Sequence, residues 1–145
     1  MLVVVGPRGW DDSEIVRHAE AEGVRLLGHV PDEDLAALYR LCVVFCYPSL
    51  YEGFGLPVLE AMRAGAPVVT SGVSSLPEIG GDAALYIDPR NTDEIRDALA
   101  RLLASEPERQ ALAERGRTQA ARFSWEHTAA ELLGQLAALA PSNRS

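Results

Sequence analysis

Positive charge is scarce in this chain. Lysine and arginine together number 13, against 21 aspartates and glutamates, which gives a net charge of −8 at neutral pH. Because no basic stripe exists to neutralise a phosphate backbone, we expect no nucleic-acid partner. Long apolar runs are also missing: the longest, residues 41–47, is far too short to span a bilayer, and no signal segment leads the chain. We therefore expect a cytoplasmic protein with no transmembrane segment.

Cysteine and histidine are rare as well, with two and three copies. Cys42 and Cys46 fall in one apolar stretch predicted to be a strand. Their Cα atoms would lie about 13 Å apart at ~3.3 Å per residue, too far for a disulfide. No second cysteine pair or nearby histidine completes a zinc site, so we expect buried, unpaired thiols. No histidine is placed where it suggests a catalytic triad.

Asp32-Glu33-Asp34 imitates a D-x-D metal motif. The three acids follow Pro31 and open a predicted helix, where the helix macrodipole favours negative charge. A D-x-D metal motif would instead follow an apolar strand directly. We interpret the three acids as helix-start residues and not as metal ligands.

Apolar strand-like runs alternate with amphipathic helical segments along the 145 residues, which predicts βαβ units and a parallel sheet. The strands are predicted at residues 2–6, 24–27, 42–47, 67–70 and 84–87. The helices are predicted at residues 12–22, 32–41, 56–64, 92–104, 106–122 and 125–140. We expect one α/β domain over residues 1–145, a Rossmann-like doubly wound sheet of about five strands with flanking helices, with a disordered tail at 141–145.

Residues 47–70 place two carboxylates, Glu52 and Glu60, eight residues apart across a glycine-rich turn that opens a helix. Gly53, Gly55 and Pro57 mark the helix start. Unpaired N–H groups and the macrodipole at such a start suit a phosphate, and carboxylates bind hydroxyl groups. A nucleotide diphosphate sugar, with phosphates between two polyhydroxyl groups, would explain both features.

The same residues resemble the E-x7-E signature of the family 4 glycosyltransferases of GT-B fold. The resemblance covers nearly the whole chain, because further motifs follow in a fixed order. They are Leu2-Val3-Val4-Val5-Gly6, residues 24–33, Gly65-Ala66-Pro67-Val68-Val69, Ser74-Ser75-Leu76-Pro77-Glu78, residues 83–89 and Arg122-Phe123-Ser124-Trp125-Glu126. The chain is thus identified with the C-terminal, donor-binding lobe of such an enzyme.

The resemblance implies a role for each residue of the motif. Backbone atoms near Val30 would read the base, Glu60 would accept hydrogen bonds from the ribose, and Glu52 would contact the donor sugar as the candidate catalytic group. The backbone N–H groups of Phe54, Gly55 and Leu56 would face the diphosphate and the sugar. Gly53 would allow the turn to approach this ligand closely. The family needs no metal and no other cofactor, since the nucleotide diphosphate sugar is its donor substrate.

Several of these residues also have plainer interpretations. Glu60, on an otherwise apolar helix, is expected to be half-buried, and a structural arginine could be its partner. Glu52 could be a solvated loop acid, and Phe54 an apolar plug instead of a stacking platform. Arg8 could approach the phosphates, although an exposed loop arginine is the stronger interpretation.

The resemblance also implies that parts are missing. The N-terminal lobe and the first strand of this lobe, whose following loop carries an Arg and Lys pair, have no counterpart here. Either strands 2–6 and 42–47 pair directly or another chain fills the gap.

We expect a retaining hexosyltransferase whose present chain is inactive alone, with a peripheral membrane contact through the missing lobe. The alternatives are a non-catalytic nucleotide-sugar-binding or interaction module and a UDP-GlcNAc 2-epimerase-like enzyme. Self-association through the last helix is a further expectation.

Overall fold

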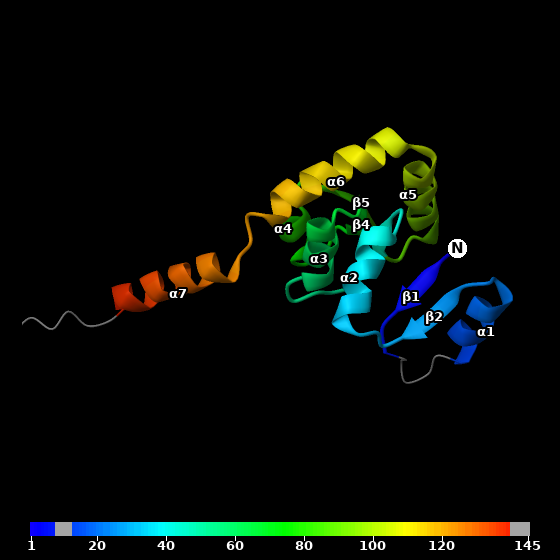
Figure 1. Cartoon of the computed structure of the whole chain (residues 1–145), viewed down its shortest axis with the longest axis horizontal. Helices are drawn as coiled ribbons and strands as arrows, with labels where there is room; N and C mark the ends of the chain where they lie inside the picture. The colour runs from blue at the N-terminus through cyan, green and yellow to red at the C-terminus, as the bar shows by residue number, and fades with distance from the viewer. Residues whose placement is uncertain (8–12, 140–145) are drawn as a thin grey trace, which may run out of the picture. The chain divides into compact units, whose positions relative to one another are not determined.

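The computed structural model describes residues 1–7 and 13–139 (Figure 1). The chain divides into two compact units, residues 1–38 and residues 39–145. The predictions made for Arg8 and for the tail at 141–145 lie outside the described residues. Whether the two units act as the single predicted domain stays a prediction.

The first unit is built on two parallel strands. It contains β1 (Val3–Val5), α1 (Ser13–Ala21), β2 (Arg25–Gly28) and most of α2 (Asp32–Leu41). The strand pairing places Val3 opposite Arg25, and the register shifts between Val4 and Val5. The acids of the imitated metal motif fall in the first turn of α2, as the helix-start interpretation predicts.

The second unit contains a three-stranded parallel sheet of β3 (Phe45–Tyr47), β4 (Val68–Ser71) and β5 (Ala84–Ile87). The strand order is β3-β4-β5, so β4 is central, and all four of its residues are buried. An uninterrupted run of buried residues is expected of a parallel strand covered on both faces.

Five helices belong to the second unit: α3 (Leu56–Ala64), α4 (Leu76–Gly80), α5 (Thr92–Ala104), α6 (Glu106–Ala120) and α7 (Trp125–Leu139). The helix α6 runs from α5 to α4 across the unit (Figure 1). It packs closely on α3, because a Cβ added at Gly116 would lie 3.3 Å from Met62 Cγ. A hydrophobic cluster joins the sheet to α5 and α6 through Val69, Ile87, Ala98, Leu102 and Leu112.

The prediction of an α/β fold with five parallel strands is confirmed. The strands nevertheless form two sheets and not one, and direct pairing of β1 with β3 is not found among the described residues. The short helix α4 was not predicted. The two cysteines are free, as expected, but Cys42 and Cys46 are half-buried where the sequence predicted buried thiols. Within residues 1–7 and 13–139, no helix has both the length and the apolar character needed to cross a membrane.

Candidate functional site

The candidate site lies at the carboxyl ends of two neighbouring strands, β3 and β4. Residues 48–55 lead from β3 to α3, and residues 72–75 lead from β4 to α4. The strand ends are joined by Thr70, whose Oγ1 donates to the Tyr47 carbonyl at 3.0 Å. Open parallel sheets bind their ligands beyond this edge, so the glycine-rich turn stands where ligand binding is expected.

Two serines of the second loop hold the first loop in place. Ser75 Oγ lies 2.7 Å from the Phe54 carbonyl and 3.1 Å from the Glu52 carbonyl, so its single proton can be donated to either or shared between them. Ser74 Oγ accepts a hydrogen bond from the Glu52 N–H at 3.0 Å. Ser74 has a left-handed backbone with φ of 49°, which is unusual for a residue other than glycine. The backbone around Glu52 is therefore fixed from the adjacent strand.

The Glu52 carboxylate is half-buried and held at one of its oxygens. Oε1 accepts hydrogen bonds from the Tyr47 hydroxyl at 2.5 Å and from Ser49 Oγ at 2.8 Å. Burial, the hydrogen bond to Glu52 and the charge of Glu52 together raise the pKa of Tyr47 to about 12. The hydroxyl thus stays protonated and able to donate, and Glu52 is more than a solvated loop acid.

Glu60 is exposed, so the expectation of a half-buried acid was wrong. It lies on α3 on the side that faces away from the buried Val58, Leu59 and Ala61. Its partner is a tyrosine, because the Tyr39 hydroxyl donates to Glu60 Oε2 at 3.3 Å. No arginine pairs with Glu60 among the described residues, so the structural partner of this carboxylate is the tyrosine and not the expected arginine. Burial is the largest cause that raises the pKa of Tyr39, and the negative charge of Glu60 is the second largest.

The start of α3 leaves backbone donors free between the two carboxylates. Gly55 is the N-cap residue with φ of 107°, and no side chain caps the helix. The N–H groups of Phe54, Gly55 and Leu56 donate no hydrogen bond within the described part of the chain. A Cβ added at Gly53 would meet no heavy atom within 4 Å, so there is open space at this position of the turn. Three successive N–H groups at the helix start can donate hydrogen bonds to the oxygen atoms of a ligand.

Phe54 and Val30 complete the set of predicted residues. The Phe54 ring is 46% exposed and meets the Phe123 ring edge-on, with centroids 6.3 Å apart. The ring is therefore packed against Phe123 and still about half accessible. Val30 is half-buried and lies in the first unit, after β2, whereas the other predicted site residues all lie in the second unit.

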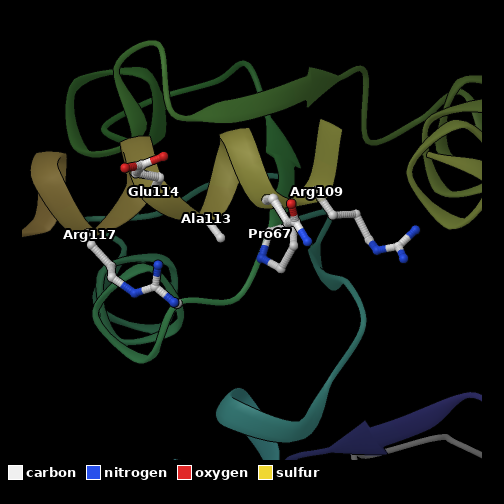
Figure 2. A pocket seen from close by; sticks show the side chains of 7 residues that line it. Pro67, Arg109, Ala113, Glu114 and Arg117 are labelled. Carbon is white, nitrogen blue, oxygen red and sulfur yellow. The ribbon is translucent and has the colours of Figure 1, made fainter. Parts of the chain in front are cut away.

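A hollow of about 400 Å³ lies elsewhere, against α6 (Figure 2). It is lined by Arg109, Glu114 and Arg117 of α6, with Pro67 just before β4. Pro67 stands at the amino edge of the sheet, opposite to the edge that carries Glu52. The hollow contains none of the predicted site residues. No cluster of three metal-binding side chains was found in residues 1–7 and 13–139.

Sequence reasoning missed the residues that hold the two carboxylates. Tyr39 was not singled out, and Tyr47, Ser49, Ser74 and Ser75 were quoted only as parts of longer motifs. A signal was present for Tyr47, since Phe45 and Tyr47 alternate along a strand that ends five residues before Glu52. The contact of Tyr39 with Glu60 joins residues 21 positions apart, and no local pattern announces it.

Known proteins resemble this chain over nearly its whole length. The family model of the group 1 glycosyl transferases matches residues 1–119. The O-antigen chain mannosyltransferase B of Escherichia coli is 48% identical over 130 residues, which cover 87% of this chain and 34% of that protein. The chain therefore spans about a third of the length of this relative.

Several solved structures also resemble this chain in fold. The sucrose-phosphate synthase of Thermosynechococcus elongatus superposes with a TM-score of 0.78 at 30% identity, covering 94% of this chain and 38% of that one. The Anabaena protein HepE, solved in complex with UDP, gives a TM-score of 0.83 at 19% identity over 94% of this chain and 40% of its own, a likeness of fold alone. The parallel strands, the paired carboxylates at their carboxyl edge and these matches together show that the chain belongs to the group 1 glycosyl transferases.

Proposed function

We propose that this chain is the donor-binding part of a retaining family 4 glycosyltransferase that moves a hexose from a nucleotide diphosphate sugar to an acceptor. The observation that carries the proposal is the arrangement of α3. Its free N–H groups stand between Glu52 and Glu60, and each carboxylate is held by a tyrosine hydroxyl. An anion site flanked by two hydroxyl-binding groups suits a diphosphate between ribose and sugar.

The roles follow from this arrangement. Glu60 accepts hydrogen bonds from the ribose hydroxyls, and the N–H groups of Phe54, Gly55 and Leu56 face the diphosphate. Glu52 contacts the donor sugar as it passes through an oxocarbenium-like state in front-face transfer. Negative charge that develops on the leaving diphosphate is stabilised by the N–H groups and the macrodipole of α3. Backbone atoms near Val30 contact the base, and no metal or cofactor takes part.

The isolated chain is proposed to bind a donor without transferring the sugar. The family's basic pair would have to neutralise the leaving group, and this sequence contains no lysine at all. The chain also spans about a third of the mannosyltransferase it resembles, 34% of that protein. This supports a missing N-terminal lobe as the partner that supplies the acceptor site. The whole protein is proposed to act in the cytoplasm, with any membrane contact made through that lobe.

Binding of nucleoside diphosphates to the purified chain tests the proposal. We expect dissociation constants near or above ~1 mM for UDP or GDP, because the basic pair is absent. An isotope-labelled sample should show amide shifts that are largest at Phe54, Gly55 and Leu56. A low-micromolar constant would contradict the need for the basic pair. An absence of shifts up to about 20 mM nucleotide, where even binding of ~2–3 kcal/mol is visible, would contradict the proposed function.

A transfer assay separates the enzyme from a binding module. The isolated chain should release no sugar from UDP-glucose or GDP-mannose. A longer natural protein that carries the same C-terminal sequence should do so when an acceptor is present. If that longer protein binds donor and never transfers, a non-catalytic module is the better description. Production of a 2-epimer would instead support the epimerase alternative.

A further inference from the structure

Three aromatic rings link the supports of the two carboxylates. Tyr39, in the last turn of α2, meets Phe45 edge-on with centroids 5.2 Å apart. Phe45 stacks on Tyr47 with centroids 6.0 Å apart and planes inclined by 15°. The rings at the two ends each carry a hydroxyl that donates to a carboxylate, Tyr39 to Glu60 and Tyr47 to Glu52.

The row has a simple origin in the backbone. Phe45 and Tyr47 are two residues apart in β3, so their side chains leave the strand on the same face and stand side by side. Tyr39 is only 7% exposed, which shows that its ring is packed in place. Offset and edge-to-face ring pairs are favourable in addition to the area that they bury. The hydroxyl groups at both ends of the row are thus set by packing.

Each hydroxyl occupies only one oxygen of its carboxylate. Tyr47 and Ser49 both bind Glu52 at Oε1, and Tyr39 binds Glu60 at Oε2. The opposite oxygens, Glu52 Oε2 and Glu60 Oε1, accept no hydrogen bond from described residues. Without these hydroxyl groups the exposed Glu60 and the half-buried Glu52 would each be less restricted, and ordering such a side chain costs about 0.5–1.5 kcal/mol on binding.

We propose that Tyr39 and Tyr47 are positioning residues that orient the two carboxylates for the hydroxyl groups of a nucleotide diphosphate sugar. Phe45 fixes the spacing between them, so the ribose-binding and sugar-binding acids are set as a pair. The inference rests on the proposed function. It adds that Tyr47 affects recognition of the sugar, whereas Tyr39 affects recognition of the nucleoside.

Phenylalanine variants isolate the hydroxyl groups, because they keep the rings and the row. Tyr47→Phe should weaken binding of UDP-glucose and GDP-mannose by about fivefold, and leave UDP and GDP within twofold of the natural chain. Tyr39→Phe should weaken binding of all four compounds by a similar factor. Tyr86→Phe is the matched control, since the Tyr86 hydroxyl donates to the Gly81 carbonyl outside the site. It should change no affinity.

Dissociation constants from amide shifts and melting temperatures are measured on the same samples. A merely structural role for Tyr47 predicts a lower melting temperature and an equal effect on ligands with and without sugar. That result, or affinities unchanged in both variants while the natural chain binds, would overturn the positioning role alone. A natural chain that binds none of the four compounds would overturn the proposed function and, with it, this inference.

Discussion

At the scale of single residues, a substitution of Glu60 separates an effect on ligand binding most clearly from an effect on folding stability. Its carboxylate is exposed and accepts a hydrogen bond from Tyr39 alone among the described residues. Glu60→Gln should therefore leave the melting temperature nearly unchanged. Hydrogen bonds to a charged group contribute ~1.5–3 kcal/mol, so nucleoside diphosphate binding should weaken about tenfold or more. Amide-shift titration measures the affinity and thermal unfolding measures stability. A lower melting temperature with unchanged affinity would assign Glu60 a structural role.

Tyr47 gives the chain a characteristic response to alkaline pH. Its pKa is about 12 in the folded protein, against the ordinary tyrosine value of 10.0. The folded state therefore holds this proton more tightly than the unfolded chain. The stabilisation is complete below about pH 10 and is lost as pH rises towards about 12.

The free energy of unfolding, measured with urea from pH 9 to pH 12, should thus fall more steeply for the natural chain than for Tyr47→Phe. Tyr39, whose pKa is also raised, contributes equally to both proteins and cancels in the comparison. In Glu52→Gln the difference should shrink without vanishing, because burial remains the largest cause of the shift. Equal slopes in the natural chain and in Tyr47→Phe would show that the hydroxyl does not make this contact in solution.

At the scale of elements, the start of α3 depends on one glycine. Gly55 has φ of 107°, and a Cβ there would lie 2.8 Å from Leu76 Cδ2 of α4. Gly55→Ala should lower the free energy of unfolding by about 2 kcal/mol, since a left-handed backbone alone costs ~1–2 kcal/mol in other residues. Gly53→Ala, where a Cβ meets nothing within 4 Å, is the control and should stay within about 0.5 kcal/mol. Urea unfolding compares them; equal losses would mean that the turn rearranges.

The elements that could be predicted are those with local signals at their ends. The helix α3 begins and ends at the predicted residues because Gly55, Pro57 and Gly65 mark its limits. The helix α4 was missed because its five residues make little more than one turn, too short to show a helical period. Strand bounds shifted by one or a few residues, since a continuous apolar run does not show where pairing stops.

The candidate site was predictable to a similar degree. The positions of Glu52 and Glu60 around a helix start follow from spacing, and the structure puts Glu52 in the loop before α3 and Glu60 on α3 itself. The exposure of Glu60 could not be read from its apolar neighbours, because it depends on which side of α3 is covered. Its hydrogen bond to Tyr39 joins residues of two different helices and is a tertiary contact.

At the scale of the whole molecule, two surfaces of the second unit have no partner within the described part of that unit. β3 is an edge strand of its sheet, with β4 as its neighbour in the described residues. No described residue of α7 is buried, and Leu132, Leu133 and Leu136 are each more than half exposed. An unpaired strand edge and an apolar helix face both favour association with another chain. Both features support the proposed association with an N-terminal lobe or with a second copy of the chain.

The apolar face of α7 predicts how the isolated chain behaves. Leucines recur at three- and four-residue steps, at Leu132, Leu136 and Leu139, so they form one apolar stripe. This stripe is exposed to water unless another surface packs against it. We expect the chain either to self-associate or to fray after Gly134. Leu136→Glu should abolish concentration-dependent association in sedimentation, whereas Ala138→Glu, which adds the same charge about 100° or more around the helix from each of these leucines, should not. A strict monomer with strongly protected amides through Leu139 would contradict both expectations, because it would require α7 to pack on its own unit.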